Sequence, residues 1–227
     1  MKNLIEITLN NIETIKSKIA GFYSESVFPR VNDLLTGSLI RHRKKVLLGA
    51  QGRILEIGFG SGLSLECYPD TVKEIIGLEP NPGMLKRAAV RTPHFTRSHL
   101  RIETGSVEAL PFGESEFDGV VSFLTLCSVS DLSKAVSEMR RVLKPSGKLF
   151  FIEHTIQAEH NVTRAIQSKL NPLWNNIACG CNLDRDTLRH LKEGGFILNE
   201  TKVLGYNGFP NFLSPLVRGI ATKETTP

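Results

Sequence analysis

A glycine-rich segment directly after an apolar run is the part of this chain whose residue types most clearly indicate ligand chemistry. It runs Glu56-Ile57-Gly58-Phe59-Gly60-Ser61-Gly62 and follows a predicted strand at 53–57. Glycines at such a turn let a ligand lie against bare backbone, and the start of a following helix supplies amide donors. A dinucleotide-binding loop would need its third glycine at the position of Leu63. The segment therefore indicates a nucleoside or similar ligand, with a purely structural turn as the alternative.

An acidic residue, Glu79, closes the next predicted strand at 74–79. It stands about 20 residues after Gly58, a spacing at which an acid can accept hydrogen bonds from both hydroxyls of a ribose. The carboxyl ends of parallel strands meet at one edge of a sheet, where open α/β sheets bind ligands. We therefore expect the glycine segment and Glu79 to form one nucleoside site.

After Arg53 the sequence alternates between apolar and amphipathic segments, which is typical of a parallel sheet wrapped by helices. These strands and helices must position the glycine segment and Glu79. Asn81-Pro82 and Asp131 are predicted helix starts, and 144–147 is a predicted turn. The last two strands flank a Gly/Pro/Asn-rich loop and should pair antiparallel. The predicted strands are 53–57, 74–79, 100–104, 117–123, 148–153, 195–204 and 216–222. The fold class is therefore α/β, a doubly wound and mostly parallel sheet of about seven strands with an antiparallel last strand.

The charge distribution and the cysteine content argue against some classes of function. The net charge of +5 is spread thinly, and its densest stretch, 41–45, has no interleaved aromatics, so we expect no nucleic-acid partner. That stretch is expected to be solvated helix surface, with contact to phosphate or anionic lipid as the alternative. The four cysteines form no disulfide framework, so we expect a cytoplasmic protein. They also form no paired metal motif, and the C-x-C at 179–181 is weak evidence for zinc, so we expect no metal site.

The N-terminal residues 4–22 have apolar side chains at helical spacing and are predicted to form an amphipathic helix. We expect it to pack on the domain or cap its mouth, and a membrane-surface helix is the alternative. Residues 1–20 have no apolar stretch suited to a signal peptide or a membrane anchor. The chain is thus divided into a helical N-terminal cap, 1–50, and a main domain, 51–227.

Five ordered segments resemble the class I S-adenosylmethionine-dependent methyltransferases: LEIGFGSG at 55–62, IGLEPNPGML at 76–85, GSVEALPF at 105–112, FDGVVSFLTLCSV at 117–129 and RRVLKPSGKLFFIEH at 140–154. The resemblance implies the Rossmann-like fold of that family, with S-adenosyl-L-methionine as cofactor and S-adenosyl-L-homocysteine as product. Ser106 stands where the relatives often have Asp. The implied cofactor-binding residues are Glu56, Gly58, Gly60, Gly62, Glu79, Pro80, Met84, Ser106, Val107 and Leu124.

Within that family the chain is similar to the small-thiol S-methyltransferases called methyltransferase-like seven A and B, in segments 125–129, 151–154, 171–174 and 180–183. Those relatives begin with a hydrophobic membrane anchor and carry an acidic residue in place of Cys179. The bacterial phosphatidylethanolamine N-methyltransferases and quinone C-methyltransferases share the cofactor motifs equally well. A small apolar thiol is therefore the first expected acceptor, and a lipid amine, a quinone carbon or a non-catalytic cofactor-binding partner protein remain alternatives.

Candidate catalytic residues follow from this chemistry. Methyl transfer from a sulfonium depends mainly on positioning, whereas a thiol acceptor reacts as its thiolate. Glu153 and His154 end the fifth predicted strand and so face the ligand edge, although a core role for His154 is an alternative. The insertion at 155–182 is expected to roof the acceptor pocket. The residues expected to line that pocket are Tyr23, Thr125, Cys127, Trp174 and Cys181.

Overall fold

The structure, a computed structural model, describes residues 13–156, 161–204 and 215–224. A single sheet has the strand order β3-β2-β1-β4-β5-β7-β6. Strands β1 to β5 pair in parallel, and β7 runs antiparallel to both β5 and β6. This confirms the predicted mostly parallel sheet with an antiparallel last strand. The strands are β1 (Gly52–Ile57), β2 (Val72–Leu78), β3 (His99–Glu103), β4 (Phe117–Phe123), β5 (Leu143–His154), β6 (Phe196–Leu204) and β7 (Leu216–Lys223).

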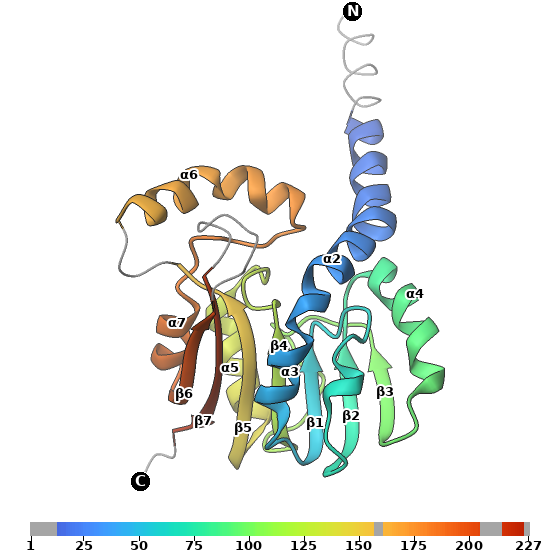
Figure 1. The fold of residues 1–227 in the computed structure, drawn as a ribbon, viewed down its shortest axis with the longest axis vertical. Helices are drawn as coiled ribbons and strands as arrows, with labels where there is room; N and C mark the ends of the chain where they lie inside the picture. The colour runs from blue at the N-terminus through green and yellow to red at the C-terminus, as the bar shows by residue number, and fades with distance from the viewer. Residues whose placement is uncertain (1–12, 157–160, 205–214, 225–227) are drawn as a thin grey trace, which may run out of the picture.

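Helices cover both faces of the sheet (Figure 1). On one face, Ile54 of β1 packs in an apolar cluster with Leu47, whereas the next residue, Leu55, packs on the other face with Met139. This alternation follows from the two-residue period of a strand. The helices are α2 (Phe28–Thr36), α3 (Ile40–Leu47), α4 (Pro82–Arg91), α5 (Leu132–Val142), α6 (Asn161–Ile177) and α7 (Thr187–Glu193).

Two of these helices begin where the sequence predicted. The Asn81 side chain accepts hydrogen bonds from the backbone N–H groups of Gly83 and Met84, and Asp131 accepts one from Lys134. The predicted turn at 144–147 is wrong, because β5 begins at Leu143, directly after α5. Leu143 already pairs with Phe117, and the extra residues before Lys148 are accommodated by a register shift in the β4–β5 ladder.

The N-terminal helical residues 13–22 extend away from the sheet beyond α2 (Figure 1). Ile15, Ile19 and Phe22 are 56%, 64% and 67% exposed, so this stretch does not pack on the domain as expected. The earlier part of the predicted helix, 4–12, lies outside the described residues. No helix among the described residues is long and apolar enough to span a membrane.

A buried carboxylate, Asp33, joins α2 to the domain. It accepts a hydrogen bond from the Ser61 hydroxyl and forms ion pairs with Arg87 and Arg91 of α4, at 2.6 and 3.0 Å. Burial raises the pKa of Asp33, but the bonds from Ser61, Arg87 and Arg91 outweigh it, so the pKa lies below its usual value. No local sequence pattern marks Asp33, because its three partners lie far along the chain.

A second buried carboxylate, Glu56, lies at the end of β1. It accepts hydrogen bonds from the Tyr68 hydroxyl, at 2.7 Å, and from the Ser64 hydroxyl. Burial raises the pKa of Glu56 to about 7, against the opposing effect of these two bonds. Glu56 therefore binds its proton more tightly in the folded protein than in the unfolded chain.

We predict that Asp33→Asn lowers the free energy of unfolding by about 2 kcal/mol at neutral pH, because two arginines lose their counter-charge. The wild-type advantage should be present above the unfolded-state pKa near 4 and should fall as the pH drops through the lower folded-state pKa. Denaturant unfolding at pH 7 and pH 3 measures both effects. The exposed Asp70→Asn variant is the control, and equal stability of the two variants at pH 7 would contradict the assignment.

We predict a pH-dependent stability difference between Glu56→Gln and the wild type. The wild type should lose up to about 3 kcal/mol of unfolding free energy from this residue as the pH rises from about 4.5 to 7, because the folded state retains a proton that the unfolded state releases. The Gln variant lacks that loss. Denaturant titrations of both proteins between pH 5 and 8 give the difference directly, and a difference independent of pH would refute the prediction.

Candidate active site

Two adjoining cavities open at the carboxyl edge of the parallel strands. The larger, of about 510 Å³, lies over the ends of β1, β2 and β4, and the smaller, of about 200 Å³, lies beside it below α6. Six residues line both cavities, so ligands that occupy the two cavities would lie side by side. The residues that line both are Phe28, Asn32, Thr36, Leu124, Ser128 and Ala178.

The glycine segment forms one wall of the larger cavity. Gly58 has a φ of 61°, and a Cβ there would lie 2.0 Å from the Thr125 hydroxyl oxygen, so no other residue fits. Gly60 has a φ of 60°, and a Cβ would meet no atom closer than 3.8 Å. The backbone of Gly60 is thus open to a ligand.

Glu79 comes directly after β2, lines the larger cavity together with the glycine segment and is 6% exposed. Its two carboxylate oxygens accept hydrogen bonds from the backbone N–H groups of Gly60, at 2.8 Å, and Asn81, at 2.7 Å. Burial raises the pKa of Glu79, and these two bonds oppose the rise. Because each oxygen has a second lone pair, the carboxylate can also accept bonds from a diol.

The other expected cofactor residues divide into two groups. Pro80, Met84, Ser106, Val107 and Leu124 line the larger cavity with Gly58, Gly60 and Glu79. Glu56 and Gly62 line neither cavity, because Glu56 is held by Ser64 and Tyr68 and Gly62 packs beside Phe59 and Leu65.

Two residues of the larger cavity make contacts that the sequence did not indicate. The Ser106 hydroxyl donates to Glu108, so it is engaged at the surface. Arg43, which was expected to be solvated, is only 6% exposed and lines the cavity with its guanidinium over the Phe123 ring. The charge pattern could not reveal this burial. An acid for a ribose, bare glycine backbone and apolar Met84 and Val107 together fit S-adenosylmethionine.

Glu153 is the next-to-last residue of β5, and its side chain is completely buried against β4. It accepts hydrogen bonds from the Ser122 hydroxyl, at 2.7 Å, and from the backbone N–H groups of Thr125 and Cys127, at 3.0 and 3.2 Å. Burial raises its pKa, and these bonds oppose the rise. Glu153 lines neither cavity, so its contacts shape the loop after β4.

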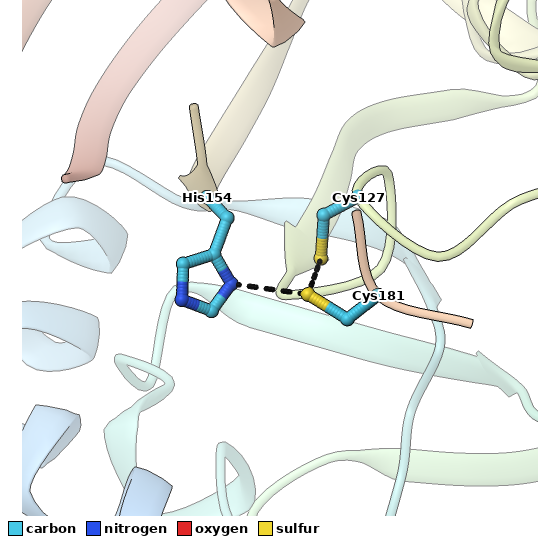
Figure 2. A group of neighbouring side chains, drawn as sticks. All are labelled: Cys127, His154 and Cys181. Carbon is cyan, nitrogen blue, oxygen red and sulfur yellow. Dashed lines mark hydrogen bonds between the residues drawn. The ribbon is translucent and has the colours of Figure 1, made fainter. Parts of the chain in front are cut away.

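The smaller cavity brings together residues from five parts of the chain, the last of them Leu216. Tyr23, Cys127, His154, Trp174 and Cys181 line it, whereas Thr125 lines only the larger cavity. The two sulfurs lie 3.4 Å apart, and the Cys181 sulfur lies 3.4 Å from Nδ1 of His154 (Figure 2). The hydrogen bond with Cys181 and burial hold the pKa of the Cys127 thiol well above its usual value, and the same bond lowers the pKa of Cys181.

Helix α6, from the insertion at 155–182, lies above the carboxyl edge of the sheet (Figure 1). The Tyr23 hydroxyl donates to the carbonyl of Ile177, at 2.7 Å, and so joins the N-terminal segment to the end of α6. Trp174 and Ile177 line the smaller cavity, and the indole Nε1 of Trp174 is buried without a hydrogen-bond partner among the described residues. Leu173, the residue before Trp174 in the insertion, is 62% exposed and lines neither cavity.

Comparison with known proteins relates this site to one family. The family described as "Methyltransferase domain" matches residues 55–151. The chain is 32% identical over 157 residues to thiol S-methyltransferase TMT1B of Homo sapiens, covering 67% of this chain and 64% of that protein. It is 34% identical over 127 residues to demethylmenaquinone methyltransferase of Renibacterium salmoninarum, covering 54% and 52%. The matches thus span less than two thirds of these relatives' own length.

The fold has counterparts among solved structures. The crystal structure of the YcgJ protein from Bacillus subtilis superposes with a TM-score of 0.66 at 17% identity, covering 84% of this chain and 100% of that one. The sheet order, the glycine wall and the acid after β2 are thus found in a domain that also matches the family by sequence. Residues 55–151, which include the glycine segment and Glu79, thus match the methyltransferase domain family, on a fold that the chain shares with the YcgJ structure.

Proposed function

We propose that this protein transfers a methyl group from S-adenosylmethionine to a small apolar thiol. The observation that carries the proposal is the pair of adjoining cavities, one with Glu79 and glycine backbone, the other apolar with two cysteines and a histidine at its wall. Similarity to a thiol S-methyltransferase supports the choice of acceptor.

Residues of the larger cavity would hold the cofactor in a fixed position. Glu79 would accept the ribose hydroxyls, Gly58 and Gly60 would contact the amino-acid part through their backbone, and Met84 would pack on the adenine. The bound cofactor supplies an electrophilic methyl group on a sulfonium. Since that leaving group needs little acid assistance, fixed alignment of the two ligands supplies most of the rate.

The smaller cavity favours a neutral or thiol-bearing acceptor. Its described lining contains no Asp, Glu, Lys or Arg, and Val31, Leu35, Trp174 and Ile177 make it largely apolar. A lipid ammonium group would find no counter-charge there, and an apolar lining excludes water from the transfer. A quinone carbon is the second candidate, because the chain is also similar to a demethylmenaquinone methyltransferase.

The two predicted catalytic residues, His154 and Glu153, have different surroundings. His154 borders the acceptor cavity through its imidazole, next to both sulfurs. Glu153 points into the protein and positions the loop that carries Cys127. We therefore assign contact with the acceptor to His154 and a positioning role to Glu153.

We predict that Glu79→Ala weakens S-adenosylmethionine binding by about 2–4 kcal/mol, because two hydroxyl hydrogen bonds to a charged acceptor are lost. Isothermal titration calorimetry on both proteins measures the change. Glu66→Ala, on the exposed surface after the glycine segment, is the control and should bind normally. Wild-type protein should not bind a nicotinamide dinucleotide. Unchanged affinity in Glu79→Ala would remove Glu79 from the cofactor site.

We predict that the protein releases S-adenosylhomocysteine with small apolar thiols in preference to amines, phenols, demethylated quinols or phosphatidylethanolamine vesicles. Trp174→Ala should lower kcat/KM for such thiols by about tenfold, equivalent to 1.4 kcal/mol of lost apolar contact. Val162→Ala, at an exposed position of the same helix, should leave it unchanged. Turnover confined to vesicle-bound amines or to quinols would refute the thiol assignment.

A further inference from the structure

The cluster at the wall of the acceptor cavity has the composition of a metal site. Cys127 comes from the loop after β4, His154 from the end of β5 and Cys181 from the segment after α6, and Figure 2 shows their sulfur and nitrogen atoms facing one another. All three ligand atoms lie within 4.8 Å of one another. Among the described residues, no other group of three His, Cys, Asp or Glu side chains has this arrangement.

The distances suit a tetrahedral ion. Zinc bonds of about 2.3 Å to sulfur and 2.0–2.1 Å to nitrogen place neighbouring ligand atoms about 3.5–3.8 Å apart. The Cys127–Cys181 sulfur distance and the Cys181–His154 sulfur-to-nitrogen distance are both 3.4 Å. These two distances are close to those of a zinc site, and all three ligand atoms lie within 4.8 Å of one another.

The surrounding hydrogen bonds hold the three segments in place. The backbone N–H and the side-chain amide of Asn182 both donate to the Cys127 carbonyl, at 2.9 Å each, and so fix the segment of Cys181 against the loop of Cys127. Glu153 accepts from the Cys127 N–H, and the Thr187 hydroxyl donates to the His154 carbonyl at 2.9 Å. Outer-shell bonds of this kind orient metal ligands.

We propose that Cys127, His154 and Cys181 bind one zinc ion, and that its fourth position, open to the smaller cavity, binds the sulfur of the acceptor thiol. This inference rests on the proposed thiol methyltransferase function. Two thiolates and an imidazole are soft ligands that favour zinc over magnesium or calcium. Three protein ligands with one open position are the arrangement of catalytic zinc sites. The sequence indicated no metal site, because a C-x-C without suitably placed partner ligands is weak evidence for zinc.

The proposed methyl transfer accounts for the proton of the acceptor thiol and for both electron pairs. The acceptor thiol loses its proton to water when its sulfur binds the ion, and two cysteine thiolates offset the charge of the ion. The bound sulfur then provides the electron pair of the new carbon–sulfur bond, while the pair of the broken bond stays on the sulfur of the donor. A neutral thioether, a weak ligand, leaves the ion.

Metal binding can be tested without any turnover. The full chain, stripped by a chelator under reducing conditions, should take up one Zn²⁺ or Co²⁺ per chain. The Co²⁺ form should show the intense visible bands of a tetrahedral ion and thiolate-to-cobalt charge transfer. Cys127→Ser, Cys181→Ser and His154→Ala should each lose more affinity than the about 10–100-fold typical of outer-shell changes.

Cys179→Ser provides a matched control. Cys179 lies two residues from Cys181 but borders the larger cavity, so this variant should keep the cobalt spectrum and the stoichiometry. Circular dichroism of every variant checks that it is folded. Absence of metal uptake by folded wild type, equal uptake by the three ligand variants, or a Cys127–Cys181 disulfide in place of metal under mild reductant would overturn the proposal.

The thiol and the metal parts have separate outcomes. Adding a small apolar thiol to the Co²⁺ form should strengthen the charge-transfer band, because a third sulfur joins the ion, and stripping the metal should abolish thiol methylation. Full thiol methylation by stripped protein would overturn the metal site and leave the proposed function intact. Metal uptake without any spectral response to thiols, together with quinol methylation, would instead refute the thiol acceptor and this fourth-ligand role.

Discussion

The carboxylate of Glu153, near the end of β5, is completely buried against β4, and the arrangement of the smaller cavity depends on it. It accepts hydrogen bonds from Ser122 of β4 and from two backbone N–H groups of the loop that follows. A buried carboxylate without such donors would be costly. These bonds therefore fix the path of the loop, bring Cys127 beside His154 and place Thr125 against Gly58, so one group shapes both cavities.

The N-terminal segment completes the site from the opposite side. Asp33 joins α2 to Ser61 and to two arginines of α4, the Asn81 side-chain amide donates to the Ser24 carbonyl, and Tyr23 reaches the end of α6. At Gly83 a Cβ would lie 2.0 Å from the carbonyl oxygen of Glu25, so the two segments are in direct contact. Residues between Tyr23 and Thr36 thus form part of the walls of both cavities.

The two cavities differ in chemistry as a methyl transfer requires. The larger has a buried acid and open backbone for a polar nucleoside, whereas the smaller combines apolar walls with sulfur and imidazole groups. At their junction Leu124 has a φ of 57°, an unfavourable conformation for a branched side chain. Its backbone N–H donates to the Ile152 carbonyl, which holds this strained residue at the boundary between the two cavities.

The sequence by itself determined the sheet and the glycine wall of the larger cavity. Strand periodicity located all seven strands, and Gly58, Gly60 and Glu79 follow strands directly, so the parallel-edge rule alone places them together. Glu56 and Gly62, which the family resemblance assigned to the cofactor, line neither cavity, because Glu56 is bound by Ser64 and Tyr68 and Gly62 packs beside Phe59 and Leu65.

Only the tertiary structure decided the acceptor side. Cys181 meets His154 across 27 residues and Cys127 across 54, and Asp33 meets its arginines across 54 and 58. The burial of Arg43 and the exposure of Leu173 and of residues 13–22 likewise depend on which segments pack beside them. A periodic pattern reports which face of an element is apolar, but not which distant segment covers it, and that pairing is fixed by packing of the whole chain.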